Sequence, residues 1–565
     1  MHSRLAFSPA LAAAALAMTA SSGTRPMLPN HAAPADLIVT AGHIYTADTI
    51  HPAAQAFAAR GGRIVFVGDR AGALALRGPA TRVLDLPGRT ILPGLADAHA
   101  HLLNLGTFLH NVDLTGTATY DEVIARVAAR ARATPPGQWI IGRGWDQNRW
   151  PDRAFPIHDA LSRAVSDHPV MLTRVDGHAL LANAKAMALA GVTAATPDPA
   201  GGRIERKPGS REPTGVFVDN AKSLIERAVP PLSDAEIDAA LLAGQAEAER
   251  WGLVSVHDPG EPERVLARLE ALAKDRRLTL RVYAMVADDS AALAHAFARG
   301  PLSALYGGHL WIRAVKLYAD GALGSRGAAL LAPYSDDPAN VGLLRNPPAH
   351  LRDVAVRALR AGFQVATHAI GDRGNRVALD AYASALAEVA VKDHRFRIEH
   401  AQVLSPADIP RFAQLGVIPS MQATHATSDM PWAERRLGPE RIKGAYAWRS
   451  LLATGVIIPN GTDTPVEPVN PLRTFHSAIT RQNEANQPPG GWYPAQRMTR
   501  DEALASMTRW AAYAAFEEQV MGTLSPGKYA DFTVLDRDIM TAAPEEILGT
   551  HVLATYVGGA AVYQR

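Results

Sequence analysis

Cysteine is absent from all 565 residues. Its absence excludes disulfide bonds, thiolate metal ligands, a cysteine nucleophile and a lipid anchor attached to cysteine. A charge excess is absent too, because 57 Lys and Arg offset 55 Asp and Glu to leave a formal net charge of +2. Such a chain has no global basic field that would draw it to nucleic acid or to anionic lipid. We therefore expect a small-molecule partner, with no nucleic acid and no membrane.

Long apolar runs are scarce, and the most conspicuous one lies at the start of the chain. Residues 1–23, "MHSRLAFSPALAAAALAMTASSG", place His2 and Arg4 before an apolar run that ends in small residues. This pattern resembles a secretory signal peptide, and an Ala-rich tail without that role is the alternative. Elsewhere no uninterrupted apolar segment reaches the roughly 18 residues needed to span a bilayer. We expect a soluble mature protein in the periplasm or outside the cell.

The hydrophobic pattern divides the remaining chain into three kinds of segment. Residues 36–90 and 519–565 carry short alternating strands broken by Gly and Asp, which predicts one composite β-sandwich domain built from both chain ends. Residues 91–518 alternate apolar strands with Ala- and Leu-rich helices, which is typical of βα units and a parallel sheet. Eight candidate strands predict an α/β fold, specifically a (β/α)8 TIM barrel.

One connection inside the predicted barrel is too long for a simple loop. Residues 112–232, after the first strand, exceed a usual βα connection by roughly a hundred residues. We interpret them as an inserted lobe. Because the lobe follows the carboxyl end of a barrel strand, we expect it to overhang the catalytic face.

Two imidazoles stand one residue apart in "LADAHAH", at His99 and His101. Side chains alternate along a strand, so both point the same way and form a partial site for zinc or a similar divalent ion. Spacing alone is weak evidence, since a His-X-His pair is often incidental. Four further residues follow apolar runs at the ends of later predicted strands, where a barrel collects its functional groups: Lys316, His368, His400 and Asp463.

In this order and spacing the six residues resemble the amidohydrolase superfamily, whose members carry His-X-His, Lys, His, His and Asp on barrel strands. The segments "LPGLADAHAHL", "GTDTPVEPVNPL" and "LSPGKYADFTVLD" extend the resemblance from about residue 36 to the chain end. Within the superfamily, "GWDQNRW", "VDGHALLANAKAM", "KLYADGALGSRGAALLAPYSD" and "THAIGDRGN" resemble the subgroup that contains N-substituted formamide deformylase.

The resemblance implies a metal centre with assigned ligands. His99, His101 and Asp463 would bind one divalent ion such as zinc, and His368 and His400 a second. In two-metal members the Lys316 amine would be carboxylated by carbon dioxide to a bridging carbamate; a one-metal variant stays open. The ions would activate a hydroxide, and Asp463 would carry its proton to the departing nitrogen.

Six more residues are candidates for substrate contact, each with a structural alternative. His178 lies in the inserted lobe and is placed to reach the substrate carbonyl. Arg326 is a candidate to hold a carboxylate, or it forms a structural ion pair. The remaining candidates are Trp145, Asp146, His425 and Asp429. His257 ends the second predicted strand, and we favour a structural role for it over a role in the site.

These features predict a metal-dependent hydrolase that cleaves a carbon–nitrogen bond of an amide or N-formyl or N-acyl amine, other than a peptide bond. Esters, lactones and phosphotriesters are alternative substrates for the same apparatus, and a catalytically silent binding protein is the alternative outside enzymes. No Gly-X-Ser-X-Gly elbow is present, and "AIGDRGN" lacks the spacing of a phosphate loop. A homodimer is an assembly compatible with these predictions.

Overall fold

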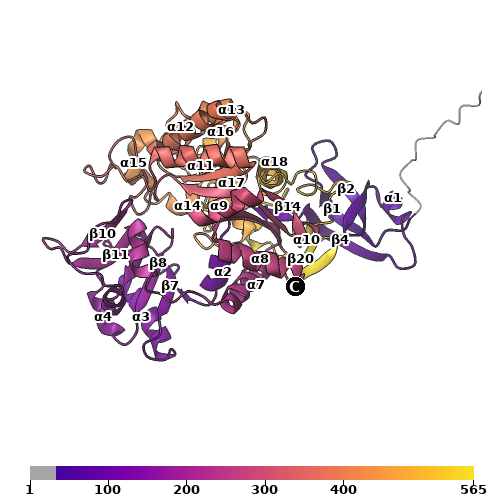
Figure 1. Cartoon of the computed structure of the whole chain (residues 1–565). Coiled ribbons are helices and arrows are strands. Elements are labelled where there is room, and N and C mark those ends of the chain that lie inside the picture. Colours follow the sequence, from indigo (N-terminus) through magenta and orange to yellow (C-terminus); the bar gives the residue numbers. More distant parts are fainter. Residues whose placement is uncertain (1–32) are drawn as a thin grey trace, which may run out of the picture.

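The computed structural model describes residues 33–565, so the expected signal peptide, residues 1–23, lies outside the described part. Figure 1 shows a central α/β body with one β-rich region on each side of it. Three sheets account for the strands of residues 33–565. Because the central sheet carries most of the candidate ligands, its topology positions the site.

The central sheet is parallel along its main path and runs in the order β18-β17-β16-β15-β13-β12-β5. Each of these strands is almost completely buried, as expected when helices cover a parallel sheet. Its strands are β5 (Leu95–Asp97), β12 (Leu253–Glu261), β13 (Arg281–Val286), β15 (Leu310–Tyr318), β16 (Gln364–Ala369), β17 (Arg397–His400) and β18 (Ile418–Ser420), with β14 (Leu302–Ala304) paired to β15.

The eighth predicted strand, "GVIIPNGTDTP", is not a regular strand. It forms an isolated parallel bridge between Asn460 and Met421, and the Asn460 carbonyl accepts from the Ala98 amide at 3.0 Å. Pro459 lacks an amide hydrogen, which prevents a continuous ladder. The segment nevertheless contacts both edges of the central sheet, next to β18 on one side and just beyond β5 on the other.

Helices between successive strands bury amphipathic faces against the sheet. In α8 the apolar positions Val265, Leu266, Leu269 and Leu272 recur at helical spacing and are all buried. The longer helices of this body are α7 (Asp234–Arg250), α8 (Glu263–Lys274), α9 (Ser290–Arg299), α11 (Pro348–Ala361), α12 (Asp372–Glu388) and α17 (Pro471–Thr480). Within residues 33–565, none of the helices combines the length and hydrophobicity needed to cross a bilayer.

Strands from both chain ends share a second sheet, in the order β21-β20-β19-β4-β1-β2-β3. β4 extends as far as Pro93, which pairs with Phe532 of β19. The apolar run before "LADAHAH" is therefore divided between two sheets. The strands are β1 (Leu37–Tyr45), β2 (Ala53–Arg60), β3 (Arg63–Gly68), β4 (Arg82–Pro93), β19 (Phe532–Leu535), β20 (Val552–Val557) and β21 (Ala560–Gln564).

A third sheet, in the order β10-β11-β9-β8-β7-β6, lies between β5 and β12 in the chain. It has its own apolar core around Trp145, Leu172 and Val216, and Figure 1 shows it to one side of the central body. We call residues 112–226 the lobe. Its strands are β6 (Val112–Asp113), β7 (Ile140–Trp145), β8 (Val170–Arg174), β9 (Ala179–Ala182), β10 (Gly202–Arg206) and β11 (Pro213–Asp219), with α3 (Tyr120–Arg132) the longest helix.

Candidate metal centre

The six candidate ligands come from five places along the central sheet. His99 and His101 follow β5, and His101 directly precedes α2 (Leu102–Phe108). Lys316, His368 and His400 lie in the carboxyl-terminal parts of β15, β16 and β17, and Asp463 follows the irregular eighth segment. Parallel strands place these ends at one edge, so residues up to 364 positions apart in the chain meet there.

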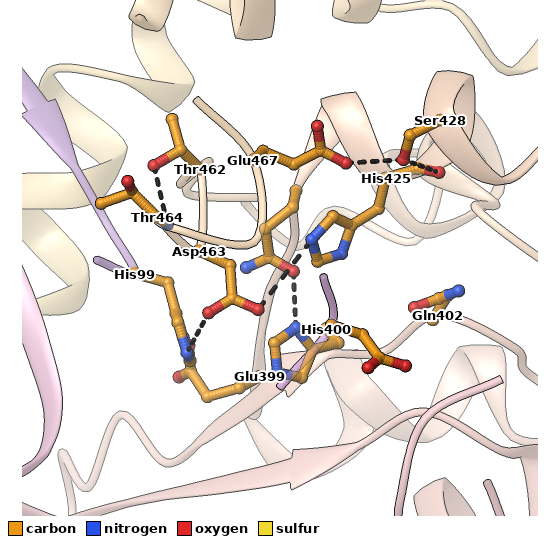
Figure 2. A network of polar contacts seen from close by, with 12 residues as sticks. His99, Glu399, His400, Gln402, His425, Ser428, Thr462, Asp463, Thr464 and Glu467 are labelled. Carbon is orange, nitrogen blue, oxygen red and sulfur yellow. Dashed lines mark hydrogen bonds and ion pairs between the residues drawn. The ribbon is translucent and has the colours of Figure 1, made fainter. Parts of the chain in front are cut away.

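Asp463 lies between His99 and His425 (Figure 2). Its Oδ1 atom is 3.2 Å from Nε2 of His101 and 3.6 Å from Nε2 of His99. The Nζ atom of Lys316 is 3.3 Å from the same His99 nitrogen. The ring of His400 lies 4.9 Å from that of His99 and 4.6 Å from that of His368, centre to centre. The structure therefore brings all six residues together.

Two of these residues have a backbone conformation that is uncommon for side chains other than glycine. His400 has φ = 74° and Asp463 has φ = 57°. A residue held in this left-handed region costs about 1–3 kcal/mol, which the surrounding packing must offset. At the end of β17 the effect is to break strand alternation, so that Glu399 and His400 both contact residues of the site. Strand periodicity alone would have directed them to opposite faces.

Partners behind the ligands fix the rings, and sequence reasoning missed them. Glu399 Oε2 lies 2.5 Å from Nδ1 of His99, and Gln422 Oε1 lies 2.7 Å from Nδ1 of His400. Arg397 donates to both carboxylate oxygens of Glu399, at 2.7 and 3.0 Å. The one available signal was "RIEHAQ", where a carboxylate adjoins a predicted ligand. With Nδ1 occupied, Nε2 of each ring is directed toward the centre, the arrangement typical of metal-bound histidines.

Burial sets the protonation states of the group. It lowers the pKa of His99 and His368 far below the ordinary value and that of His400 to about 3. Burial opposes ionisation of Asp463, but the hydrogen bond with His101 and the nearby imidazoles hold its pKa well below the usual range. Burial lowers the pKa of Lys316 to about 8. Neutral imidazoles and an ionised carboxylate are the forms that bind a cation.

The donor set fits a divalent ion. His99, His101 and Asp463 each offer one ligand atom, and these atoms lie within 4.8 Å of one another; His400, His425 and Asp463 do the same. Nε2 of His425 is buried without a hydrogen-bond partner in residues 33–565, and it lies 3.9 Å from Oδ2 of Asp463. A buried polar atom lacking a partner is costly unless a ligand satisfies it. Nitrogen and carboxylate ligands in this number suit zinc and similar ions.

A cavity of 1090 Å³ opens over this group, and both the lobe and the central body line it. Four of the six predicted substrate-contact residues lie on its wall: Asp146, His178, His425 and Asp429. Asp146 accepts a hydrogen bond from Arg174 at 2.5 Å. Asp429 accepts from Tyr446 and Gln402, and burial raises its pKa well above the ordinary value.

Within the described residues, the cavity wall includes neither Trp145 nor Arg326. Trp145 is fully buried in the lobe core and donates from Nε1 to the Leu172 carbonyl at 2.8 Å. Arg326 pairs with Asp336 at 3.2 Å. The structural alternatives describe both residues: a register shift in β7 between Arg143 and Trp145 breaks the alternation and lets Trp145 pack in the lobe core, and an acidic neighbour neutralises Arg326. His257 is buried and accepts from Arg397 at 2.9 Å, a structural position behind the ligands.

Comparison with known proteins agrees with this geometry. Residues 82–563 match the model of the amidohydrolase family. The chain belongs to that family. It is 35% identical to Protein LONG AFTER FAR-RED 3 of Arabidopsis thaliana, over 94% of this chain and 92% of that protein. It is also 29% identical to N-substituted formamide deformylase of Arthrobacter pascens, over 94% of this chain and 98% of the deformylase.

A solved structure is similar as well. An uncharacterized metal-dependent hydrolase from Pyrococcus horikoshii OT3 superposes with a TM-score of 0.73 and 28% identity, over 90% of this chain and 99% of the other. The family resemblance carried by the sequence motifs of this amidohydrolase is thus confirmed.

Proposed function

We propose that this amidohydrolase hydrolyses a carbon–nitrogen bond of a small non-peptide amide, such as an N-formyl or N-acyl amine. The observation that carries the proposal is the position of Asp463 Oδ1, 3.2 Å from Nε2 of His101 and 3.6 Å from Nε2 of His99, beside the cavity. The name of the Arthrobacter pascens relative supports the substrate class. We further propose that the central sheet and its eighth segment form a closed (β/α)8 barrel, as hydrogen bonds at both edges support.

His99, His101 and Asp463 would hold one divalent ion, and His368 and His400 a second, with Lys316 as a carbamate ligand. A divalent ion held there would polarise a carbonyl and lower the pKa of an adjacent water. Zinc is the ion we propose, because imidazole and carboxylate are ligands that it favours.

The side chains divide the remaining work. Asp463, ionised in the free protein, accepts the proton of the attacking water and delivers it to the departing nitrogen. His178 lies on the cavity wall with its ring centre 5.0 Å from that of His368, close enough to contact the substrate carbonyl. Lobe residues line the cavity together with the central body, so a substrate bound between them would be partly removed from water.

The test combines metal analysis with a substrate panel. Purified protein should hold about one or two equivalents of zinc-like metal and lose activity on chelation. Asp463→Asn should lower kcat by at least about 100-fold on N-formyl and N-acyl amines, the scale of general acid–base catalysis. Asp198→Asn, a lobe carboxylate paired with Arg206, is the matched control and should behave as wild type. Higher kcat/KM on aryl esters or lactones would reject the amide assignment, and bound metal without turnover would reject catalysis.

A further inference from the structure

A carboxylate in the lobe stands directly behind His178. Asp219, at the end of β11, places Oδ1 2.7 Å from Nδ1 of His178, and its side chain is fully buried. The backbone reinforces the contact, because the Asp219 amide donates to the His178 carbonyl at 2.8 Å. Asp176 accepts from the His178 amide at 3.0 Å. The imidazole is therefore fixed from its ring and from both of its backbone polar groups.

The opposite ring nitrogen faces the cavity. With Nδ1 engaged by Asp219, Nε2 of His178 is the nitrogen left for a ligand, and the ring lines the same cavity as the metal centre. A carboxylate behind an imidazole holds one orientation and compensates the positive charge that the ring carries when both nitrogens hold hydrogen. In that state Nε2 donates a hydrogen bond, as a developing oxyanion requires.

Asp219 also contacts the loop that follows Lys316 and β15. A Cβ atom placed on Gly321 would lie 2.5 Å from Oδ2 of Asp219, and one placed on Gly327 would lie 2.4 Å from it. Neither glycine is in the left-handed region, so the need at both positions is space. The first and last glycines of "GALGSRG" therefore leave the space in which the Asp219 carboxylate of the lobe packs against the central body.

We propose that Asp219 is a positioning residue that orients His178 toward the substrate carbonyl, and that Gly321 and Gly327 leave the space in which this pair assembles. The inference rests on the proposed function for the role of His178, but the His178–Asp219 contact exists independently of the substrate. Within the described residues Asp219 does not line the cavity, so it would act on the substrate through His178.

A double-mutant cycle separates this role from a structural one. His178→Gln should lower kcat by about 100-fold, the scale of one lost oxyanion donor. Asp219→Asn, whose side chain keeps the size and shape of Asp, should lower kcat by about 10- to 100-fold at nearly constant KM. The double variant should match His178→Gln within about threefold, because a residue that acts only through another adds nothing once the other is gone. If the fold reductions in kcat of the two single variants multiply in the double variant, the two residues act independently and the proposal is overturned.

Two further measurements do not depend on turnover by the loaded enzyme. In protein with ¹⁵N-labelled histidine, the hydrogen-bonded Nδ1 proton of His178 should give a resonance that disappears in His178→Gln and moves upfield in Asp219→Asn, because a neutral amide oxygen is a weaker acceptor than a carboxylate. An unchanged resonance in Asp219→Asn would overturn the proposal. Gly327→Ala should displace the carboxylate and remove the same resonance while metal content is kept; Gly549→Ala, which meets no atom within 4 Å, is the control. If the wild-type protein hydrolyses no amide but shows the resonance, the proposed function is wrong and the His178–Asp219 contact is still supported.

Discussion

Glu399 and His99 form a fully buried pair, with 2.5 Å between Oε2 of the carboxylate and Nδ1 of the ring. Because this contact orients the ring and raises its basicity, we expect Glu399→Gln to weaken metal affinity by about 10- to 100-fold. Competition with a chelator of known affinity measures the change. Glu388→Gln, a surface carboxylate paired with Arg360, is the control and should keep wild-type affinity. Since Arg397 also loses its partner, circular dichroism should first establish that the variant is folded; unchanged affinity in folded protein contradicts the prediction.

Lys316 is predicted to carry a carbamate. In zinc-loaded protein equilibrated with ¹³C-bicarbonate, NMR should show a carbamate carbon in wild type and none in Lys316→Gln. Metal content should fall from about two equivalents to about one in that variant, because the bridging group is lost. Lys222→Gln removes another lysine from the same cavity wall and should keep the signal. One equivalent of metal and no carbamate in wild type would instead favour the one-metal variant.

Trp145 is predicted to stabilise the lobe and to leave substrate binding unchanged. Trp145→Phe removes the hydrogen bond to the buried Leu172 carbonyl and part of the lobe core. We expect the free energy of unfolding to fall by about 1–3 kcal/mol, the cost of an unsatisfied buried polar group. Denaturant titration measures stability, and steady-state kinetics should give an unchanged KM. A large rise in KM without loss of stability would return Trp145 to the substrate site.

Glu249 on α7 should make stability depend on pH. Burial raises the pKa of its carboxyl to about 7, although the Thr279 hydroxyl donates to it. A carboxyl whose pKa is higher in the folded state contributes stability below its unfolded pKa, and this contribution is lost as pH rises through about 7. Glu249→Gln should therefore match wild type near pH 4 and exceed it at pH 8 by about 3 kcal/mol.

Thermal unfolding of both proteins across this range tests the Glu249 prediction, because the difference between them removes the contribution of other buried carboxyls. Parallel pH profiles for wild type and Glu249→Gln would contradict it. Glu247→Gln, which removes a partly exposed carboxylate two residues away on α7, is the control variant.

Residue types and their order were sufficient to predict the α/β class, the family and the six candidate ligands. These features can be predicted because they depend on local sequence pattern. Buried parallel strands appear as apolar runs, and the polar residues that end these runs lie at the same edge of the sheet. His99, Lys316 and His368 could be located in this way without knowledge of any contact between them.

Tertiary structure alone decided which side chains support the ligands. Glu399 meets His99 across 300 positions, and Asp219 meets His178 across 41, so no local period connects them. The left-handed backbone at His400 and Asp463 is imposed by surrounding packing and leaves no mark on hydrophobic alternation. Trp145 and Arg326 were predicted to contact substrate, but neither lines the cavity in the described residues. Whether an aromatic or a cationic side chain lines a cavity depends on neighbours that only the folded chain supplies.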